Sequence, residues 1–236
     1  MRKQVYVGCE ECGVKNDSLF KGLPQEEIEN INYHKSCAFY KKGQILFHEG
    51  TRPLGVYCVN QGKIKIYRTG DDGKDQIIKI ATGGDLLGYK AIVSDELYPV
   101  SGETLESTKV CFIPKSEFLG MLTRVPSFGQ QLLQATCQEM GTMTQNITSL
   151  AQKSVRERLA VTLLMLKDTY DVDPAAGEET EVEINLTRED LANIVGTATE
   201  TIIRLLHDFK EEKLIKTKGR KIKVLNPKKL VRVGNI

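Results

Sequence analysis

The 236-residue sequence predicts an α+β protein built from a roll of short β-strands, a long helix and a C-terminal helix-turn-helix with a β-hairpin wing. Three observations predict this order. Residues 39–114 alternate short runs of β-forming residues with glycine turns. Residues 126–151 carry a helical repeat of apolar residues. Residues 187–224 read as two helices joined by a glycine, followed by a hairpin of basic and apolar residues.

Glycines divide the first part into short strands. The runs at residues 45–47, 56–59, 63–67 and 76–80 are each rich in β-branched or aromatic residues. Asp71-Asp72-Gly73 is a hairpin-turn sequence that joins two of them. The expected product is an antiparallel roll or barrel that encloses either a pocket or a packed core.

A single long helix is expected from residue 126 to residue 151. Its apolar residues recur at steps of three and four, with Thr136 filling one step: Leu133, Met140, Met143, Ile147 and Leu150. This is coiled-coil spacing, so the helix is expected to pair with its copy in a homodimer. A helix that only covers the roll is the alternative.

Two helices joined by a tight turn are predicted from residue 187 to residue 206. Thr187 can cap the first helix through its hydroxyl, with Asp190 three residues later in a variant of the capping box. Gly196 supplies the positive φ that a turn between crossed helices needs. Thr197 or Thr199 can cap the second helix. The second helix therefore starts at a sharp angle to the first.

The second helix has two different faces. Its inward face is expected to hold Ile202, Leu205 and Leu206, and its outward face Thr199, Glu200, Ile203 and Arg204. Glu200 and Arg204 lie one turn apart. Glutamate accepts a hydrogen bond from cytosine and arginine bonds guanine bidentately, so the pair suits a G·C pair in a major groove. A salt bridge between the two side chains on a solvated helix is the alternative.

Positive charge is concentrated in this last part of the chain. Residues 184–236 include 12 basic and 6 acidic side chains, a net charge of +6, whereas the whole chain is only +2. Residues 214–224 alternate apolar and basic residues around Gly219, which predicts a wing with one charged face. Such a wing grips phosphates while the helix reads bases. The residues expected to contact DNA are Thr187, Arg188, Thr197, Thr199, Glu200, Thr201, Ile203, Arg204, Lys218 and Arg220.

The expected organisation has four parts: a cysteine-bearing segment at 1–20, a sensor roll at 21–125, a dimerisation helix at 126–151 and a DNA-binding domain at 152–236. There is no apolar run of about 18 residues to span a bilayer and no apolar core of a secretory signal. A cytoplasmic protein without membrane contact is expected, with its six cysteines reduced. Cys58 and Cys137 are expected to be small buried hydrophobes. No catalytic motif of a hydrolase, nucleotidase or metalloprotease occurs, so an enzyme is disfavoured.

The order of roll, long helix and winged helix-turn-helix resembles the CRP/FNR family of transcription regulators over nearly the whole chain. The family's signature turns and recognition helix are matched by Tyr40-Lys41-Lys42-Gly43-Gln44, Gly62-Lys63-Ile64-Lys65, Gly84-Asp85-Leu86-Leu87-Gly88-Tyr89, and Val195-Gly196 with Glu200-Thr201-Ile202-Ile203-Arg204. The resemblance implies a cyclic-nucleotide-binding-like roll, a homodimer on a palindromic site in double-stranded DNA, and RNA polymerase as a partner. It also implies that Glu200 and Arg204 read bases, while Thr199 and Ile203 tune half-site preference.

The effector is expected to differ from cyclic AMP. The cyclic-nucleotide branch of the family holds its ligand with a Gly-Glu turn and a later Arg-Ser pair. Here Tyr89 follows Gly88, and residues 95–101 contain no arginine. A buried phosphate without a cation is costly, and Lys90 is a weak substitute. The candidate effector-pocket residues are Gly84, Gly88, Tyr89 and Ser101.

The oxygen-sensing FNR branch is more similar, through residues 84–92 and 105–114. That branch binds a four-iron four-sulfur cluster through Cys-x2-Cys-x5-Cys near the N-terminus and one distant cysteine. Cys9 and Cys12 match the first two ligands, and Cys111 matches the distant one. The third position is Ser18, and a serine alkoxide is a poor substitute for a thiolate. The resemblance therefore implies an iron–sulfur site with one ligand unassigned.

Cys37, with His34 nearby, can supply the missing ligand. The candidate metal ligands are thus Cys9, Cys12, Cys111 and Cys37, for an iron–sulfur cluster ahead of tetrahedral zinc. Loss of the cluster is one alternative, and a thiol redox switch between Cys9 and Cys12 is another.

Two functions remain in view. The first is a dimeric, sequence-specific DNA-binding regulator that senses a signal through the roll or the N-terminal cysteines and transmits it through a hinge at residues 151–154. The second is a metal-binding or small-ligand-binding protein whose C-terminal domain serves protein contacts. The second predicts DNA affinity no better than that of any basic patch.

Overall fold

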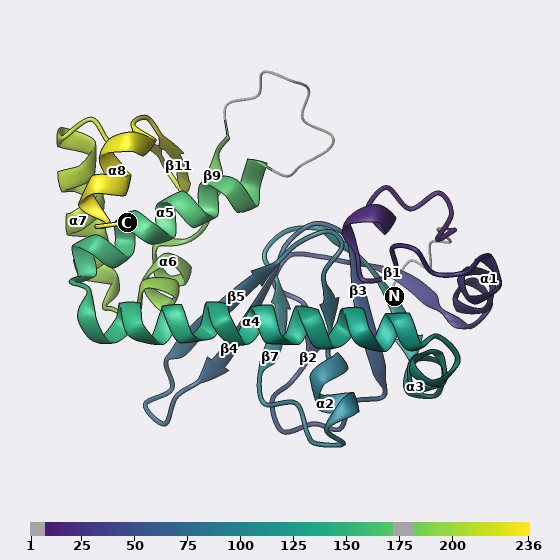
Figure 1. The fold of residues 1–236 in the computed structure, drawn as a ribbon. Helices are drawn as coiled ribbons and strands as arrows, with labels where there is room; N and C mark the ends of the chain where they lie inside the picture. Colours follow the sequence, from purple (N-terminus) through teal and green to yellow (C-terminus); the bar gives the residue numbers. More distant parts are fainter. Residues whose placement is uncertain (1–7, 172–181) are drawn as a thin grey trace. The chain divides into compact units, whose positions relative to one another are not determined.

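A computed structural model describes residues 8–171 and 182–236. The described chain forms two compact units: one of residues 8–68 and 78–140, and one of residues 69–77 with 141–171 and 182–236. The order of elements agrees with the predicted α+β class: two short helical segments lead into the strands of the roll, and one long helix and a helical domain with a small sheet follow (Figure 1).

The helices are η1 (Lys15–Asp17), α1 (Gln25–His34), α2 (Tyr89–Val93), α3 (Lys115–Arg124), α4 (Pro126–Gln152), α5 (Val155–Asp171), α6 (Arg188–Val195), α7 (Thr199–Glu211) and α8 (Pro227–Val233). The strands are β1 (Ser36–Tyr40), β2 (Ile45–Phe47), β3 (Gly55–Gln61), β4 (Ile64–Thr69), β5 (Asp75–Ala81), β6 (Leu86–Leu87), β7 (Ser101–Thr104), β8 (Thr108–Pro114), β9 (Ile184–Asn185), β10 (Ile215–Lys218) and β11 (Lys221–Val224). None of the helices in the described ranges is long and apolar enough to cross a membrane.

The roll consists of two antiparallel four-stranded sheets. One has the strand order β1-β8-β3-β6 and the other β2-β7-β4-β5. Because side chains alternate across a strand, the first sheet buries both of its faces. Its inner face joins a core that includes Tyr40, Val59 and Val110. Its outer face joins a second core with Cys58, Ile113 and the helix residues Phe118 and Phe128.

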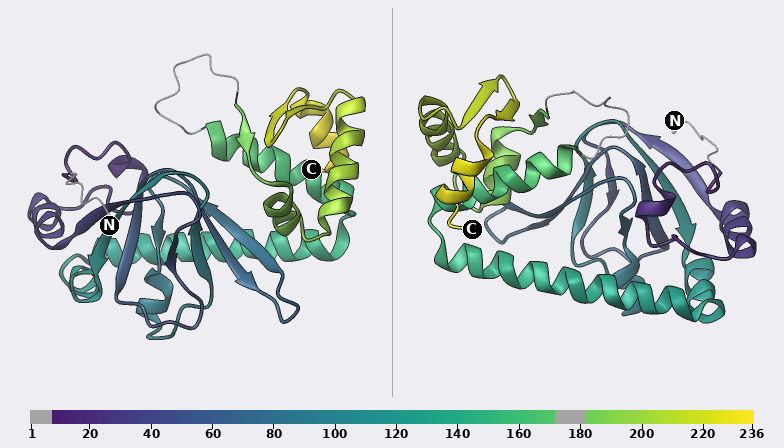
Figure 2. Two further views of the ribbon diagram at one scale, coloured as in Figure 1. Left: turned by 180° about the vertical axis from the view of Figure 1, so that it is seen from behind. Right: turned by 45° about the horizontal axis from the view of Figure 1, so that its top comes forward.

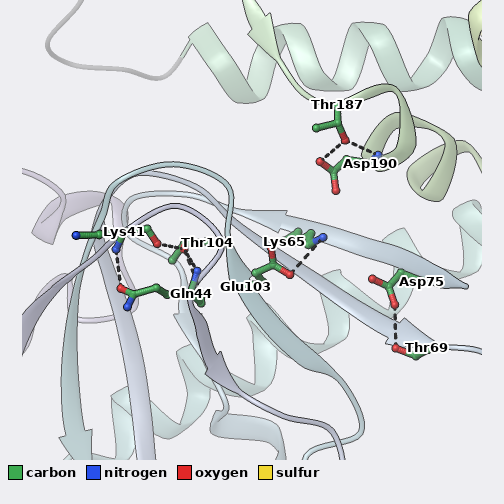
Figure 3. A network of polar contacts seen from close by, with 9 residues as sticks. All are labelled: Lys41, Gln44, Lys65, Thr69, Asp75, Glu103, Thr104, Thr187 and Asp190. Carbon is green, nitrogen blue, oxygen red and sulfur yellow. Dashed lines mark hydrogen bonds and ion pairs between the residues drawn. The ribbon is translucent and has the colours of Figure 1, made fainter. Parts of the chain in front are cut away.

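The turn after β1 is fastened to β7 by a buried threonine (Figure 3). The Thr104 hydroxyl donates to the Lys41 carbonyl at 2.6 Å and accepts from the Gln44 backbone N–H at 3.0 Å. The Gln44 side chain in turn accepts from the Lys41 backbone N–H at 2.7 Å. Gly43 between them has a φ of +78°, which explains the glycine in this turn. The turn therefore holds the edge of β1 in place.

An ion pair fastens α1 to α3 beside the roll, at the end where η1 and β1 also lie (Figures 1 and 2). Arg124 donates to both carboxylate oxygens of Glu27, with Nε to Oε1 at 2.7 Å and Nη2 to Oε2 at 3.0 Å. Glu27 is buried. The hydrogen bond and charge of Arg124 hold the pKa of Glu27 below its ordinary value of 4.5, against the opposing effect of burial. The pair connects the elements that flank the N-terminal segment.

Replacing Glu27 with glutamine is expected to destabilise the first unit by about 1–3 kcal/mol at neutral pH, because Arg124 loses a charged partner. In the wild type this stabilisation is complete above the ordinary pKa of 4.5 and is lost as the pH falls through the lower folded value. Urea unfolding at neutral and acid pH measures both effects. The exposed neighbour Glu26, replaced by glutamine, is the matched control. Equal stability of the two variants at pH 7 would contradict the assignment.

The second unit packs its helices around fully buried apolar residues. Leu159, Leu163 and Leu166 of α5 are buried, as is Phe209 of α7. The Arg156 guanidinium lies over the Phe209 ring at 4.7 Å and pairs with Glu212 at 2.6 Å. The strands β9, β10 and β11 form a three-stranded sheet in which β11 lies between β9 and β10. The predicted wing hairpin at residues 214–224 is confirmed.

Candidate nucleic-acid interface and cysteine site

The first helix of the helix-turn-helix begins at a side-chain cap (Figure 3). The Thr187 hydroxyl accepts a hydrogen bond from the Asp190 backbone N–H at 2.9 Å and donates to the Asp190 carboxylate at 2.6 Å. This confirms the capping variant expected from the sequence. Both side chains are therefore engaged within α6.

The turn between α6 and α7 is built on Gly196, which has a φ of +72° as predicted. Arg158 of α5 braces the turn, donating to the carbonyls of Val195 at 2.9 Å and Gly196 at 3.1 Å. A cation at the C-terminal end of α6 also suits the helix dipole. The expected cap of the second helix by a threonine is wrong: Ala198 occupies the N-cap position, and no side chain caps the helix. The turn is held by Arg158 instead.

The second helix, α7, separates its apolar and polar faces. Ile202, Leu205, Leu206 and Phe209 are buried. On the opposite face, Glu200, Ile203 and Arg204 are exposed, with Thr199 and Thr201 partly so. Among the described residues, no ion pair joins Glu200 to Arg204, although they are one turn apart. The two side chains are thus available to base edges.

The wing presents four lysines on one face. In the register of β10 and β11, Lys216 lies opposite Lys223 and Lys218 opposite Lys221, while Ile222 on the other face is fully buried. Like charges directly opposite one another destabilise a strand pair. Lys221 is paired with Glu183 within the chain, and a polyanion laid along this face offsets the remaining repulsion. Lys218 and Arg220, at the exposed tip, flank Gly219.

Arg188 occupies a different place from the other basic residues expected to contact DNA. Its Nη2 donates to the Gly219 carbonyl in the wing turn at 2.9 Å. Its Nη1 is buried and has no hydrogen-bond partner within the described chain. Burial lowers the pKa of this guanidinium below its ordinary value. Arg188 therefore joins the first helix to the wing, and Thr197 lies partly buried in the turn after that helix.

The long helix α4 leaves an apolar stripe uncovered in the single chain. Phe128 and Leu132 are buried against the roll. Four of the large residues of the predicted coiled-coil series are exposed: Leu133, Met140, Ile147 and Leu150. Ile147 is 67% exposed, which a single chain does not explain. An apolar stripe of this spacing matches the seam of a paired helix.

A cavity of about 350 Å³ lies on the inner face of the roll, lined by Ser36, Cys37, Ala38, Tyr40, Tyr57, Val110 and Phe112. None of the four residues expected to form the effector pocket lines it. The Ser101 hydroxyl accepts from the Glu49 N–H at 2.9 Å. The Tyr89 hydroxyl lies 3.4 Å from both Thr136 and Glu139 of α4. The lining contains no lysine or arginine.

The other two effector-pocket residues, Gly84 and Gly88, act as backbone turns. Both have positive φ, and a side chain at Gly84 would meet the Asp17 backbone, whereas one at Gly88 would meet Tyr98. Lys90, considered as a substitute cation, is paired with Glu139 at 2.6 Å. The signature turn at residues 84–89 therefore positions the chain around α2 and the η1 segment.

Three cysteines lie in a row across the first sheet. Cys37 of β1 is in register with Cys111 of β8, and Cys111 is in register with Cys58 of β3. Directly opposed residues of antiparallel strands project to the same face, so the three sulfurs share the outer face. Cys37 and Cys111 are joined by a disulfide. The expectation of six reduced cysteines is therefore wrong for this pair, because the register brings their Cα atoms to 4.1 Å.

The N-terminal cysteines lie over the same face. The Cys9 sulfur accepts a hydrogen bond from Lys35 Nζ at 2.7 Å, and its N–H donates to Asn32 at 2.8 Å. The Cys12 sulfur accepts from Asn60 Nδ2 at 3.2 Å. Lys35 precedes β1 and Asn60 is in β3, so the Cys-x2-Cys pair extends across the row.

Cys58 is the functional candidate that sequence reasoning missed. It is buried, and its pKa is raised to about 12, first by burial and then by the charges that Cys12 and Cys9 carry when ionised. The Cys12 sulfur is bound by Asn60, which lies two residues along β3 from Cys58. From the alternating pattern of its strand, Cys58 could only be read as an apolar strand residue. Its position opposite Cys111 is visible only in the folded sheet. Cys137, expected to be buried, is exposed on α4.

The donor set suits a thiolate-bound metal centre in its chemistry, but its arrangement in the described chain does not form a metal site. Five sulfurs gather on one face, and four thiolates hold an iron–sulfur cluster. Within the described ranges, no group of three or more Cys, His, Asp or Glu side chains is arranged to hold a metal ion. Two of the five sulfurs are bonded to each other. Four thiolates would be available on this face only after the Cys37–Cys111 disulfide is reduced.

Comparison with known proteins assigns both parts of the chain. A model of the cyclic nucleotide-binding domain matches residues 38–125, and a model of the Crp-like helix-turn-helix domain matches residues 157–233. The chain is 28% identical over 231 residues to the fumarate and nitrate reduction regulatory protein of Vibrio cholerae, covering 98% of this chain and 91% of that protein. It is 27% identical over 228 residues to the transcriptional activator protein Anr of Pseudomonas protegens, covering 96% and 92% of the two chains.

Solved structures share the fold. FixK2 from Bradyrhizobium japonicum superimposes with a TM-score of 0.74 at 22% identity, over 84% of this chain and 96% of that one. The regulator CLP of Xanthomonas campestris superimposes with a TM-score of 0.73 at 18% identity, over 86% and 100% of the two chains. The similarity extends through both the roll and the helix-turn-helix.

Proposed function

Because the chain belongs to the CRP/FNR family and is a DNA-binding transcription regulator, we propose that it reads a two-fold symmetric duplex site as a homodimer. One observation carries the proposal: α7 exposes Glu200 and Arg204 without pairing them, above a buried apolar face. Glutamate and arginine at this spacing match the cytosine and guanine of one base pair. Ile203 and Thr199 lie beside them, where they contact the flanking bases.

The wing and the long helix complete this mode of binding. The lysine face of the wing binds the phosphate backbone and supplies affinity without sequence information. The exposed stripe of α4 pairs with its copy, which doubles the number of recognition helices. RNA polymerase is the proposed protein partner of the bound dimer, and the cytoplasm is its proposed location, as both follow from regulation of transcription.

We propose that the signal is received at the cysteine face of the roll. The supporting observation is the gathering of five sulfurs beneath the N-terminal segment. An iron–sulfur cluster, when bound there, supplies a redox- and oxygen-dependent bond between the N-terminal segment and the sheet. Cys9, Cys12 and Cys111 would hold it with one of the two sulfurs that flank Cys111, which are those of Cys37 and Cys58.

Lys35 and Asn60 supply hydrogen-bond donors to the N-terminal cysteine sulfurs. Their N–H groups donate to the half-buried sulfurs of Cys9 and Cys12 and would offset thiolate charge there. The cavity lined by Tyr40, Tyr57 and Phe112 is not part of this proposal, although Cys37 also contributes to its lining. A signal at the cysteines therefore acts through the ordering of the N-terminal segment.

The test of the DNA-binding mode is selection of duplexes from a random library by the full chain, prepared both reduced without oxygen and oxidised in air. A two-fold symmetric consensus is expected, bound at least ~10³-fold more tightly than a scrambled duplex of equal length at physiological salt. Equal affinity for both duplexes in both preparations would overturn it. That result would favour a metal-binding or small-ligand-binding protein whose C-terminal domain serves protein contacts.

A further inference from the structure

The turn of the β4–β5 hairpin contacts the helix-turn-helix through one side chain. Residues 69–77, which include this turn, belong to the second compact unit, while the rest of both strands belongs to the first. We propose that Gln76 is a positioning residue for DNA reading, which fastens the C-terminal end of α6 and so holds the recognition helix α7 in the orientation that reads bases. This inference deepens the proposed reading of a duplex and rests on it.

The side-chain nitrogen of Gln76 lies among three backbone carbonyls. Nε2 donates to the carbonyl of Asn193 at 2.7 Å, to that of Ile77 at 3.2 Å and to that of Ile194 at 3.4 Å. Three acceptors around one terminal atom require the nitrogen there, because an amide oxygen cannot donate. Gln76 is therefore a hydrogen-bond donor to the end of α6.

The carbonyls that Gln76 binds are among those that a helix end leaves without a partner. The last four carbonyls of a helix have no donor within the helix itself. In α6 the first of these four is bound by backbone N–H groups of the following turn, and the last by Arg158. Gln76 binds the two between them. Two side chains from outside the helix-turn-helix thus complete this end of α6.

The contact at Gln76 is closely packed. A Cβ atom at Gly196, in the turn after α6, would lie 3.0 Å from Cδ2 of Leu150 and 3.5 Å from Oε1 of Gln76. A contact of 3.0 Å is shorter than the 3.5–4.0 Å that carbon atoms prefer. The turn therefore packs directly against both side chains, and Gln76 supplies the hydrogen bonds of this contact.

The contact leaves the DNA-reading surface free. Gln76 binds carbonyls at the end of α6, whereas Glu200 and Arg204 of α7 and Lys218 of the wing are exposed. A blocking contact would bury part of that surface. Only residues 196–198 separate α6 from α7, so fixing the end of α6 also fixes the start of the recognition helix. The contact thus holds α7 without covering it.

The first part of the test measures amide hydrogen exchange of residues 188–198 in the free full chain by mass spectrometry. Gln76→Glu keeps the side-chain size but replaces the donor with a carboxylate oxygen that faces carbonyls. Exchange is expected to become about 10-fold faster, equivalent to about 1.4 kcal/mol. Gln76→Lys keeps a donor and places a cation at a helix C-terminus, so its exchange is expected to match the wild type.

Lys74→Gln is the matched control, because it makes the same change in net charge as Gln76→Glu at an exposed position of the same hairpin. It is expected to exchange at the rate of the wild type. Wild-type exchange in Gln76→Glu, or equally fast exchange in Lys74→Gln, would overturn the inference. Far-ultraviolet circular dichroism of each variant shows that the chain is folded.

The second part titrates each protein with the duplex selected by the wild type and with a scrambled duplex, at one salt concentration. Gln76→Glu is expected to bind the selected duplex about 10-fold more weakly, with affinity for the scrambled duplex nearly unchanged because the wing lysines are untouched. Gln76→Lys and Lys74→Gln are expected to keep the specificity ratio of the wild type. A change that only destabilised the fold would weaken binding to both duplexes.

Tighter or unchanged binding of the selected duplex by Gln76→Glu would show that the contact blocks reading or is irrelevant to it, and either result overturns the inference. A wild type that selects no duplex contradicts the proposed function instead. In that case the exchange rates still decide whether Gln76 fastens α6, so the two failures are distinguishable.

Discussion

Replacing Arg204 with alanine is expected to abolish discrimination of the selected duplex. A bidentate arginine contact to guanine contributes about 1–3 kcal/mol of discrimination, so two half-sites contribute roughly 2–6 kcal/mol, or about 30-fold to 10⁴-fold in affinity. Arg204 is exposed on α7 and has no ion-pair partner in the described chain, so the fold does not depend on it. Competition of specific against scrambled duplex at fixed salt measures the effect.

The wing provides the matched control for this experiment. Lys218 is exposed beside Gly219 and is expected to touch phosphate only. Lys218→Ala should therefore weaken binding to specific and scrambled duplexes alike, and it should reduce the salt slope of the dimer by about 2 because one phosphate in each half-site is no longer neutralised. Arg204→Ala should leave nonspecific binding nearly unchanged. If the Arg204→Ala protein kept the specificity ratio of the wild type, α7 would not be the element that reads the bases.

Replacing Ile147 with glutamate is expected to separate the dimer. Ile147 is 67% exposed on α4 within the predicted seam, so a charge there meets its copy in the paired helix and is buried without a partner. A single subunit reaches only one half-site, and its specific affinity should fall by at least ~10³-fold, since specific dimers bind at about 10⁻⁸ to 10⁻¹¹ M. Sedimentation equilibrium and duplex titration measure the two effects together.

Gln145 serves as the control position on the same helix. It is exposed and lies about 200° from Ile147 around the helix, outside the apolar stripe. Gln145→Glu adds the same charge and is expected to remain a dimer with wild-type DNA affinity. Because both positions are exposed in the single chain, neither change should lower helix content. A dimeric Ile147→Glu protein would show that α4 is not the subunit interface.

Local patterns in the sequence were sufficient to predict the DNA-reading domain. The cap at Thr187, the left-handed Gly196 and the alternation of residues 214–224 each depend on neighbours within a few positions. The buried face of α7 follows from helical periodicity for the same reason. The cap of α7 was predicted incorrectly, because the helix starts directly after Ala198, so that neither neighbouring threonine occupies the N-cap position. Element boundaries depend on tertiary packing more than element type does.

The sensor site depended on contacts that no local pattern contains. The sequence placed Cys9 and Cys12 together, since they are three residues apart, and the family resemblance added Cys111. Only the pairing of β1, β8 and β3 set Cys37, Cys111 and Cys58 side by side, because strand register is fixed by the whole sheet. The same sheet places Cys37 also in the lining of the roll cavity. Periodicity within one strand assigns a face to a residue, but it does not assign the neighbour across the sheet, and only that pairing places Cys58 beside Cys111.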